Sequence, residues 1–173
     1  SWRDEKSLVR WRTTTKHHKV QQAARDRVFE DYHLRIGQLI ADTQTPPGQV
    51  LQEQRLDVTE VGAGKAVMLL DAKRAPEWPK QVGAQAVAAS FGLVADAPGL
   101  VAWDAFDALM APGEAIVVAT WIDQSAAEAF ERAAQLPHDV RLRHIRVIRE
   151  YGMFDRREAP QYFEDVRPAA QPR

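Results

Sequence analysis

The first 43 residues combine a helical pattern with a strand pattern. Apolar side chains recur at helical spacing over residues 4–29, with lysines and arginines between them. Asp4 opens this stretch and suits an N-cap, because its carboxylate can accept the free N–H groups of the first turn. Over residues 32–40, apolar and polar side chains alternate with the period of a half-buried strand. The pattern predicts one helix over 4–29 and one strand over 32–40.

A longer alternation of strand and helix patterns follows. The strand-forming runs are 65–72, 100–109, 115–121 and 140–149, and the helical runs are 76–93 and 123–134. Pro76 and Pro79 fit the first turn of the first helical run, Gly92 fits its end, and Asp123 caps the second. The β-α-β-β-α-β order predicts a ferredoxin-like α+β unit, in which two helices lie on one face of a four-stranded antiparallel sheet.

The strand-forming run over 116–121 is uncharged on both of its faces. Ile116, Val118 and Thr120 alternate with Val117, Ala119 and Trp121. A sheet with two such faces needs a second layer opposite its helices, and another sheet of the same kind would provide it. We therefore expect the strand over 32–40 to belong to a second sheet that packs against the first.

The start of the chain resembles the end of the longer unit. Trp2-Arg3-Asp4 aligns with Trp121-Ile122-Asp123, and Asp31-Tyr32-His33-Leu34-Arg35 aligns with Asp139-Val140-Arg141-Leu142-Arg143. The interval between the two blocks is eleven residues longer in the first copy. The matches indicate a tandem repeat, with chance similarity of amphipathic segments as the alternative. The first copy lacks its opening strand, first helix and second strand, which we expect to precede Ser1 or else to come from another chain.

This repeat divides the chain into four parts. Residues 1–43 are the C-terminal half of a first unit, a helix plus a strand. Residues 44–64 contain Pro46-Pro47-Gly48 and few large apolar side chains, so they are expected to form a linker. Residues 65–155 are a complete second unit, and 156–173 are a C-terminal tail.

Composition and charge exclude several classes of function. The 173 residues contain 23 Lys and Arg against 24 Asp and Glu, a net charge of −1, so we expect no nucleic-acid partner and no membrane partner. There is no cysteine, which excludes disulfides, thiolate metal ligands and cysteine nucleophiles. No apolar run approaches the roughly 20 residues that a membrane helix needs. We expect a cytoplasmic protein.

Three stretches of the sequence carry a family resemblance. They are Trp2-Arg3-Asp4-Glu5 through Trp11-Arg12, then Phe29-Glu30-Asp31-Tyr32-His33-Leu34-Arg35, and finally Arg149-Glu150-Tyr151-Gly152-Met153-Phe154-Asp155-Arg156 with Glu158-Ala159-Pro160. Together they resemble antibiotic biosynthesis monooxygenases. The resemblance implies ferredoxin-like sheets paired back to back as a dimeric α+β barrel, in a homodimer or within one tandem chain. It also implies either oxidation of polycyclic phenols without metal or flavin, or binding and degradation of haem.

Two positions depart from what the resemblance implies. Quinone-forming members have an asparagine four residues before a tryptophan that matches Trp121, and Val117 stands there. Haem-degrading members have an iron-ligating histidine ten residues after a tryptophan that matches Trp11, and Gln21 stands there. His17 and His18 lack the i, i+4 spacing of a metal site. We therefore expect no haem, no metal and no other cofactor.

Six side chains are candidates to line a substrate cavity. They are Trp103, Phe106, Trp121, Arg143, His144 and Tyr151. The aromatic side chains would supply apolar walls, although a core role is the more usual one for Trp121. Arg143, or Arg35 in the first copy, would pair with an anionic group, and His144 would act as an acid or base. Salt bridges and a hydrogen-bonded structural histidine are the alternatives for these polar residues.

Two functions from different classes remain open at this point. The first is a cofactor-independent monooxygenase that acts on a small aromatic or polyketide-like molecule in a barrel cavity. The alternative is a non-catalytic barrel that binds a ligand or serves only as a stable fold. A sizeable pocket with convergent polar groups would favour the enzyme, and a filled interior would favour the alternative.

Overall fold

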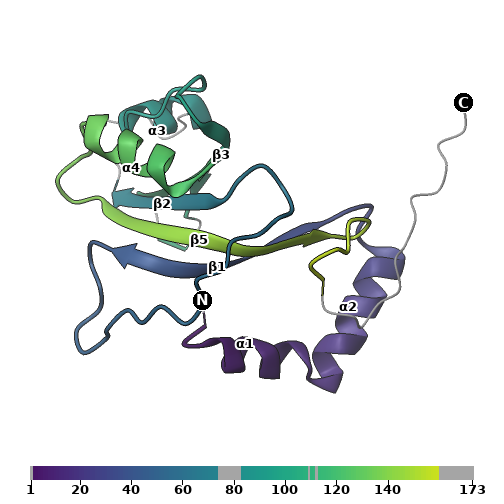
Figure 1. Ribbon diagram of the computed structural model, residues 1–173. Coiled ribbons are helices and arrows are strands. Elements are labelled where there is room, and N and C mark those ends of the chain that lie inside the picture. Colours follow the sequence, from purple (N-terminus) through teal and green to yellow (C-terminus); the bar gives the residue numbers. More distant parts are fainter. Residues whose placement is uncertain (1, 74–82, 109, 112, 160–173) are drawn as a thin grey trace, which may run out of the picture.

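Five strands form one antiparallel sheet in the computed structural model, which describes residues 2–73, 83–108, 110, 111 and 113–159 (Figure 1). The strands are β1 (His33–Asp42), β2 (Ala66–Lys73), β3 (Leu100–Asp107), β4 (Glu114–Trp121) and β5 (Arg141–Gly152). Their order across the sheet is β1-β5-β2-β4-β3, and each neighbouring pair is antiparallel. The two edges of the sheet are therefore β1 and β3.

Two helices pack on the sheet and two lie beside it. The helices are α1 (Glu5–Arg12), α2 (Thr15–Arg27), α3 (Ala84–Ser90) and α4 (Gln124–Ala133). α3 contacts β3 and β4, while α4 contacts β2 and β4. The elements β2, α3, β3, β4, α4 and β5 thus follow each other in the predicted order, and the strand order β5-β2-β4-β3 is that of a ferredoxin-like unit. The predicted α+β ferredoxin-like fold is confirmed.

The core lies between this sheet and helices α3 and α4. Alternate residues of β2 and β4 point toward the helices, as the two-residue period of a strand requires. Met68, Leu70, Val117 and Trp121 are fully buried there. The Trp121 ring packs against Phe130 of α4 with 5.0 Å between ring centroids. Apolar burial of this kind contributes about 25 cal/mol per Å², so this layer is the main source of stability for the second unit.

Helix ends follow the predicted signals. The Asp4 carboxylate accepts a hydrogen bond from the Ser7 backbone N–H at 2.7 Å, and the Asp123 carboxylate accepts one from the Ala126 N–H at 2.8 Å. Gly92 has a φ of +72° two residues after α3 ends, a conformation that glycine adopts without strain. Pro76 and Pro79 lie outside the described residues, as do Leu109 at the end of the third predicted strand and the tail from 160 onward.

The prediction of one continuous helix over 4–29 is wrong, because the chain breaks at Thr13 and Thr14. The Thr13 hydroxyl donates to the Val9 carbonyl at 2.9 Å, and the Thr14 hydroxyl donates to the Trp11 carbonyl at 2.9 Å. Threonine hydroxyls compete in this way with the backbone N–H groups that would continue a helix. A run of three β-branched residues, Thr13 to Thr15, adds to the break.

The prediction that the strand over 32–40 belongs to a second sheet is also wrong. β1 pairs edge to edge with β5, from His33 opposite Gly152 to Asp42 opposite Arg143, with two irregularities in register. β5 is 12 residues long, and β2 covers one of its edges only from Arg141 to Arg146. β1 pairs with the other edge, whose N–H and C=O groups would otherwise lack strand partners. A strand in a stacked sheet and a strand added to the edge of the same sheet have the same alternating pattern. The sequence pattern therefore did not distinguish the two arrangements.

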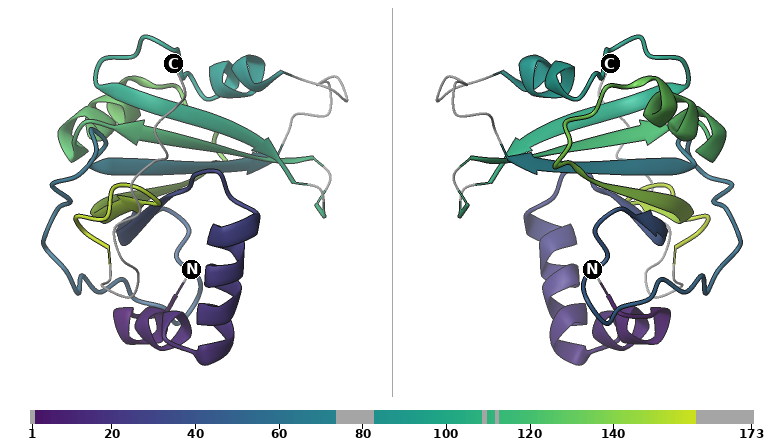
Figure 2. Two further views of the ribbon diagram at one scale, coloured as in Figure 1. Left: turned by 90° about the vertical axis from the view of Figure 1, so that its right-hand side faces the viewer. Right: turned by 90° about the vertical axis from the view of Figure 1, so that its left-hand side faces the viewer.

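Helices α1 and α2 lie on the β1 side of the sheet, apart from α3 and α4 (Figure 2). α1 buries no residue, and Arg25 is the one buried residue of α2. Val20 and Val28, which belong to the apolar pattern of the helix predicted over 4–29, are largely exposed. No helix in the described parts of the chain has the length and apolarity to cross a membrane.

Candidate active site

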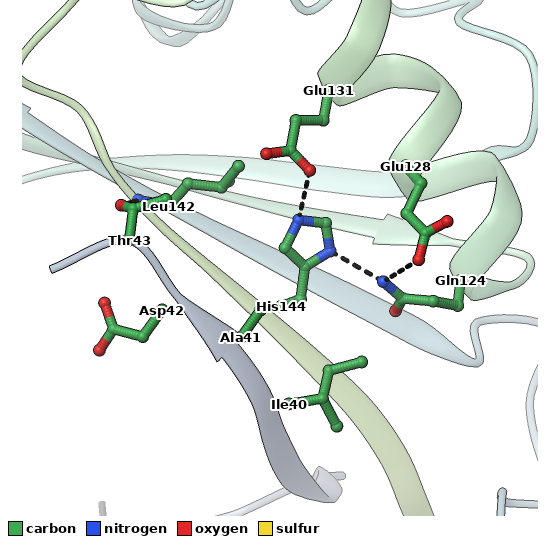
Figure 3. A pocket seen from close by; sticks show the side chains of 9 residues that line it. All are labelled: Ile40, Ala41, Asp42, Thr43, Gln124, Glu128, Glu131, Leu142 and His144. Atoms are coloured by element: carbon green, nitrogen blue, oxygen red, sulfur yellow. Dashed lines mark hydrogen bonds and ion pairs between the residues drawn. The ribbon is translucent and has the colours of Figure 1, made fainter. Parts of the chain in front are cut away.

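A pocket of about 450 Å³ lies between α4 and the paired ends of β1 and β5 (Figure 3). It is lined by Ile40, Ala41, Asp42 and Thr43 at the end of β1, by Gln124, Glu128 and Glu131 on α4, and by Leu142 and His144 on β5. Ile40, Ala41 and Leu142 therefore make the strand side partly apolar, and the α4 side is polar. Apolar walls with a few convergent polar groups are typical of small-molecule sites.

His144 is a buried titratable group of the pocket, with 5% of its surface exposed. Its strand directs it to the helix side of the sheet, as it does Leu142 two residues earlier. The ring Nε2 lies 2.9 Å from Glu131 Oε2, and the ring Nδ1 lies 3.0 Å from Gln124 Nε2. An amide nitrogen only donates, so Nδ1 accepts and the proton resides on Nε2, from which it is donated to Glu131. The hydrogen-bond partners thus assign a single tautomer to His144.

Three residues of α4 present this polar wall from one face of the helix. Gln124, Glu128 and Glu131 follow an i, i+4, i+7 spacing, which brings side chains above one another on a helix. Gln124 Nε2 also donates to Glu128 Oε1 at 3.2 Å. Hydrogen bonds therefore connect Glu131, His144, Gln124 and Glu128 in that order. Gln124 Oε1 is buried without a hydrogen-bond partner among the described residues.

An ion pair fixes the β1 side of the pocket. The Asp42 side chain is 2% exposed, and its two oxygens accept from Arg141 Nε at 2.9 Å and Nη2 at 2.6 Å. The hydrogen bond from the Arg141 guanidinium holds the pKa of Asp42 below its usual value, despite the opposing effect of burial. Thr43 Oγ1 accepts from the Leu142 N–H at 2.9 Å. These contacts hold the end of β1 against the start of β5.

The arrangement is suited to moving a proton. A carboxylate that accepts from one nitrogen of an imidazole stabilises the positive charge that appears when the other nitrogen takes up a proton. Here Glu131 is the carboxylate, and Nδ1 of His144, which faces the Gln124 amide, is the ring nitrogen that could take up a proton. Among the residues that the structure describes, no group of three or more histidines and acidic residues could hold a metal ion.

Of the six candidate cavity residues, His144 alone lines this pocket. Trp121 is fully buried in the core, and Trp103 is half-buried against the same core. Phe106 is 55% exposed and pairs with Ile116, whose side chain points away from α3 and α4. The structure therefore separates the aromatic candidates between the core and the opposite face of the sheet.

The remaining candidates lie elsewhere along β5 and β1. Arg143 forms an ion pair with Asp71 on the face away from the helices. Arg35 Nε lies 2.8 Å from Glu150 Oε2, so both arginines form salt bridges. Tyr151 is buried at the far end of β5, where burial raises the pKa of its hydroxyl. None of these three side chains reaches the pocket beside His144.

The sequence contained a signal for the rest of the site that the prediction did not use. Gln124, Glu128 and Glu131 have the spacing of one helix face, and Phe130 and Ala127 on the same helix point to the core. A polar face toward a buried histidine is unusual enough to mark a site. The contribution of Ile40 to Thr43 was hidden because the strand over 32–40 was expected in a different sheet.

Comparison with known proteins gave one clear relative. A protein of Pyricularia oryzae named Jasmonate monooxygenase ABM is 40% identical over 167 residues, which are 94% of this chain and 73% of the relative. No family model matches the chain. No solved structure matches it.

Proposed function

The chain belongs to the antibiotic biosynthesis monooxygenase family, and from this premise we propose that it is a monooxygenase of a small organic molecule. The observation that carries the proposal is the pocket beside His144, which combines apolar walls with a carboxylate–imidazole pair. The ferredoxin-like fold agrees with family membership. A substrate bound there would have its polar groups next to α4 and its apolar part against the ends of β1 and β5.

In this proposal, His144 accepts a proton from the substrate. Removal of that proton leaves an electron-rich enolate or carbanion, which can pass electrons to O₂. When a methylene group is oxidised to a carbonyl, the substrate itself supplies the electrons: CH₂ plus O₂ gives C=O plus H₂O. Glu131 stabilises the imidazolium that forms. This route uses no cofactor.

The walls of the pocket and the family support a proposal for the substrate class. We propose a small aromatic or polyketide-like molecule, since Ile40, Ala41 and Leu142 supply an apolar surface. Jasmonate appears in the name of the relative and is therefore the first compound to test. A hydroxynaphthalene represents the phenolic substrates that other members of the family oxidise.

Oxygen incorporation tests the proposed activity. Purified protein would be incubated with each compound under ¹⁸O₂, and products analysed by mass spectrometry. We expect one labelled oxygen atom per product molecule. His144→Gln and Glu131→Gln should lower turnover by about 10²- to 10⁴-fold, the range of general acid–base catalysis. Glu30→Gln, a charge change in the loop before the opposite end of β1, should leave it unchanged. Full activity of His144→Gln would contradict the assignment of the site, and no product from any compound would contradict the activity.

The protein is also proposed to assemble as a homodimer through the face of the sheet away from α3 and α4. Leu69, Ile116 and Val118 are half-buried on this face and Phe106 is exposed, so it offers apolar area to a second sheet. Light scattering after size-exclusion chromatography would give the mass in solution. We expect a dimer for the wild type and a monomer for Phe106→Glu, and a monomeric wild type would contradict the proposal.

A further inference from the structure

The side chains that line the pocket have few hydrogen-bond donors left for a ligand. The Gln124 amide has two N–H groups, and they are directed at His144 Nδ1 and Glu128 Oε1. The Nε2 proton of His144 is directed at Glu131. Except for the Thr43 hydroxyl, the polar atoms that remain are acceptors, including the buried Gln124 Oε1. A ligand therefore gains hydrogen bonds here by bringing its own donors.

The charged side chains that line the pocket also disfavour an anionic ligand. Three carboxylates line it, and one of them, Asp42, is neutralised by Arg141. Glu131 is engaged by His144. Glu128 receives one amide hydrogen bond at 3.2 Å, and its nearest guanidinium, Arg132, lies 3.9 Å away on the exposed side of the helix. Glu131 accepts from an uncharged imidazole, so neither Glu131 nor Glu128 faces a buried cation, and Glu128 is the one of the two that does not contact His144.

From these observations we infer that the pocket selects an uncharged ligand with hydrogen-bond donors over a ligand with a free carboxylate, and that Glu128 contributes to this preference. The inference rests on the proposed function in one respect, namely that the pocket beside His144 is the substrate site. A ligand carboxylate would lie close to Glu128 and Glu131 and would find no unused N–H group among the lining side chains. The corresponding ester or alcohol would avoid the repulsion.

The expected size of the preference follows from Coulomb's law. Two unit charges about 4 Å apart in a solvent-exposed setting repel each other enough to change affinity by about fivefold, and more when the site is shielded from water. Glu128 is half-exposed, so the lower end of this range applies. Neutralising Glu128 should therefore remove about a fivefold discrimination.

Calorimetric titration with a matched pair of ligands tests the inference. The probes are jasmonic acid and its methyl ester, titrated at neutral pH into oxygen-free protein so that no turnover occurs. Wild type should bind the ester about fivefold more tightly than the acid. In Glu128→Gln the ester-to-acid ratio should fall by about fivefold, whereas Glu30→Gln, which makes the same charge change far from the pocket, should keep the wild-type ratio. Melting temperatures of the three proteins confirm that each is folded.

Each other outcome overturns the inference. Tighter or equal binding of the acid to wild type contradicts the preference, and so does the absence of ester binding. An unchanged ratio in Glu128→Gln contradicts the role of that residue. Because the titration involves no turnover, the two proposals fail separately. Intact selectivity without oxygen incorporation contradicts the proposed function alone, and oxygen incorporation with preferred binding of the acid contradicts this inference alone.

Discussion

His144 is fixed at both ring nitrogens by side chains of a single helix. Glu131 and Gln124 hold the ring from α4, while the histidine itself belongs to β5. Its orientation therefore depends on how the helix sits on the sheet. A side chain placed by two elements in this way is better ordered than one held by its own strand, which is what a proton acceptor requires.

At the same scale, Trp121→Ala should destabilise the fold by about 3–5 kcal/mol, because it removes a fully buried ring and leaves a cavity beside Phe130. The denaturation midpoint in urea would report the change. Trp2→Ala is the matched control, since that ring is half-exposed, and should cost less than about 1 kcal/mol. Equal effects of the two changes would contradict the placement of Trp121 in the core.

The Asp42–Arg141 pair makes an acid-sensitive contribution to stability. The pKa of Asp42 is lowered in the folded state, so the pair stabilises the fold above the usual carboxyl pKa and is lost as pH falls below it. Asp42→Asn should cost about 1–2 kcal/mol at neutral pH and make the decline toward acid shallower. Denaturation midpoints between about pH 7 and about pH 3 measure both effects. Parallel acid declines for variant and wild type would exclude this role of Asp42.

Of the site, the sequence predicted His144 but neither of its partners on α4. A histidine on a strand can be singled out by its chemistry alone, whereas Gln124 and Glu131 matter because α4 crosses the sheet at that point. The aromatic candidates do not come together in one site, because their types can be read from the sequence but the sheet face that each one occupies was not considered. Trp121 and Phe106 both have the composition of a cavity wall, and the pleat of the sheet directs them to opposite faces.

At the scale of elements, the turn before β3 determines where α4 can lie. Gly99 has a φ of +80°, and a Cβ placed there would lie 2.6 Å from the Cβ of Ala126 on α4. No real side chain fits at that distance, so glycine permits the close approach of turn and helix. The helix that carries the polar wall of the pocket therefore depends on a residue outside the pocket.

Gly99→Ala should consequently cost about 2–4 kcal/mol, from backbone strain together with overpacking against α4. Gly113→Ala provides the control, since Gly113 also has a positive φ, +92°, but no atom within 4 Å of an added Cβ. It should cost only the backbone part, about 1–2 kcal/mol. The comparison uses denaturation midpoints, and equal losses would show that the contact with Ala126 carries no energy.

The elements of the second unit were predictable because each has a local signal. Asp123 caps α4, Gly92 follows α3, and the strands are rich in β-branched and apolar residues. The partner of β1 had no such signal. Alternation in β1 is equally compatible with stacking on a sheet and with extension of its edge, and only the long unpaired edge of β5 decides between them.

For the whole molecule, β5 is the strand that joins the two halves of the chain. It pairs with β1 on one side and with β2 on the other, so the sheet is continuous across the proposed linker. The sheet with α3 and α4 should therefore unfold in one transition. α1 and α2 bury almost nothing and are expected to open more readily.

Hydrogen exchange followed by mass spectrometry tests this division. Amides of β2, β4 and β5 should exchange only through global unfolding, because they lie in the sheet beneath the core. Amides of α1 and α2 should exchange at least about tenfold faster. Far-ultraviolet circular dichroism and tryptophan fluorescence should report the same main transition. Protection of α1 equal to that of β5 would contradict the expected difference.

The side chains of the polar wall of the pocket all come from one short stretch of the chain. Gln124, Glu128 and Glu131 fall within eight consecutive residues of α4, and a single insertion or deletion before them would turn all three by roughly 100° at once. Substitutions at the same positions change the chemistry of the wall without touching a backbone hydrogen bond of the sheet. Divergence of ligand preference can therefore proceed in one helix while selection preserves the sheet, and homologues with the same fold should differ most at these three positions when they accept different compounds.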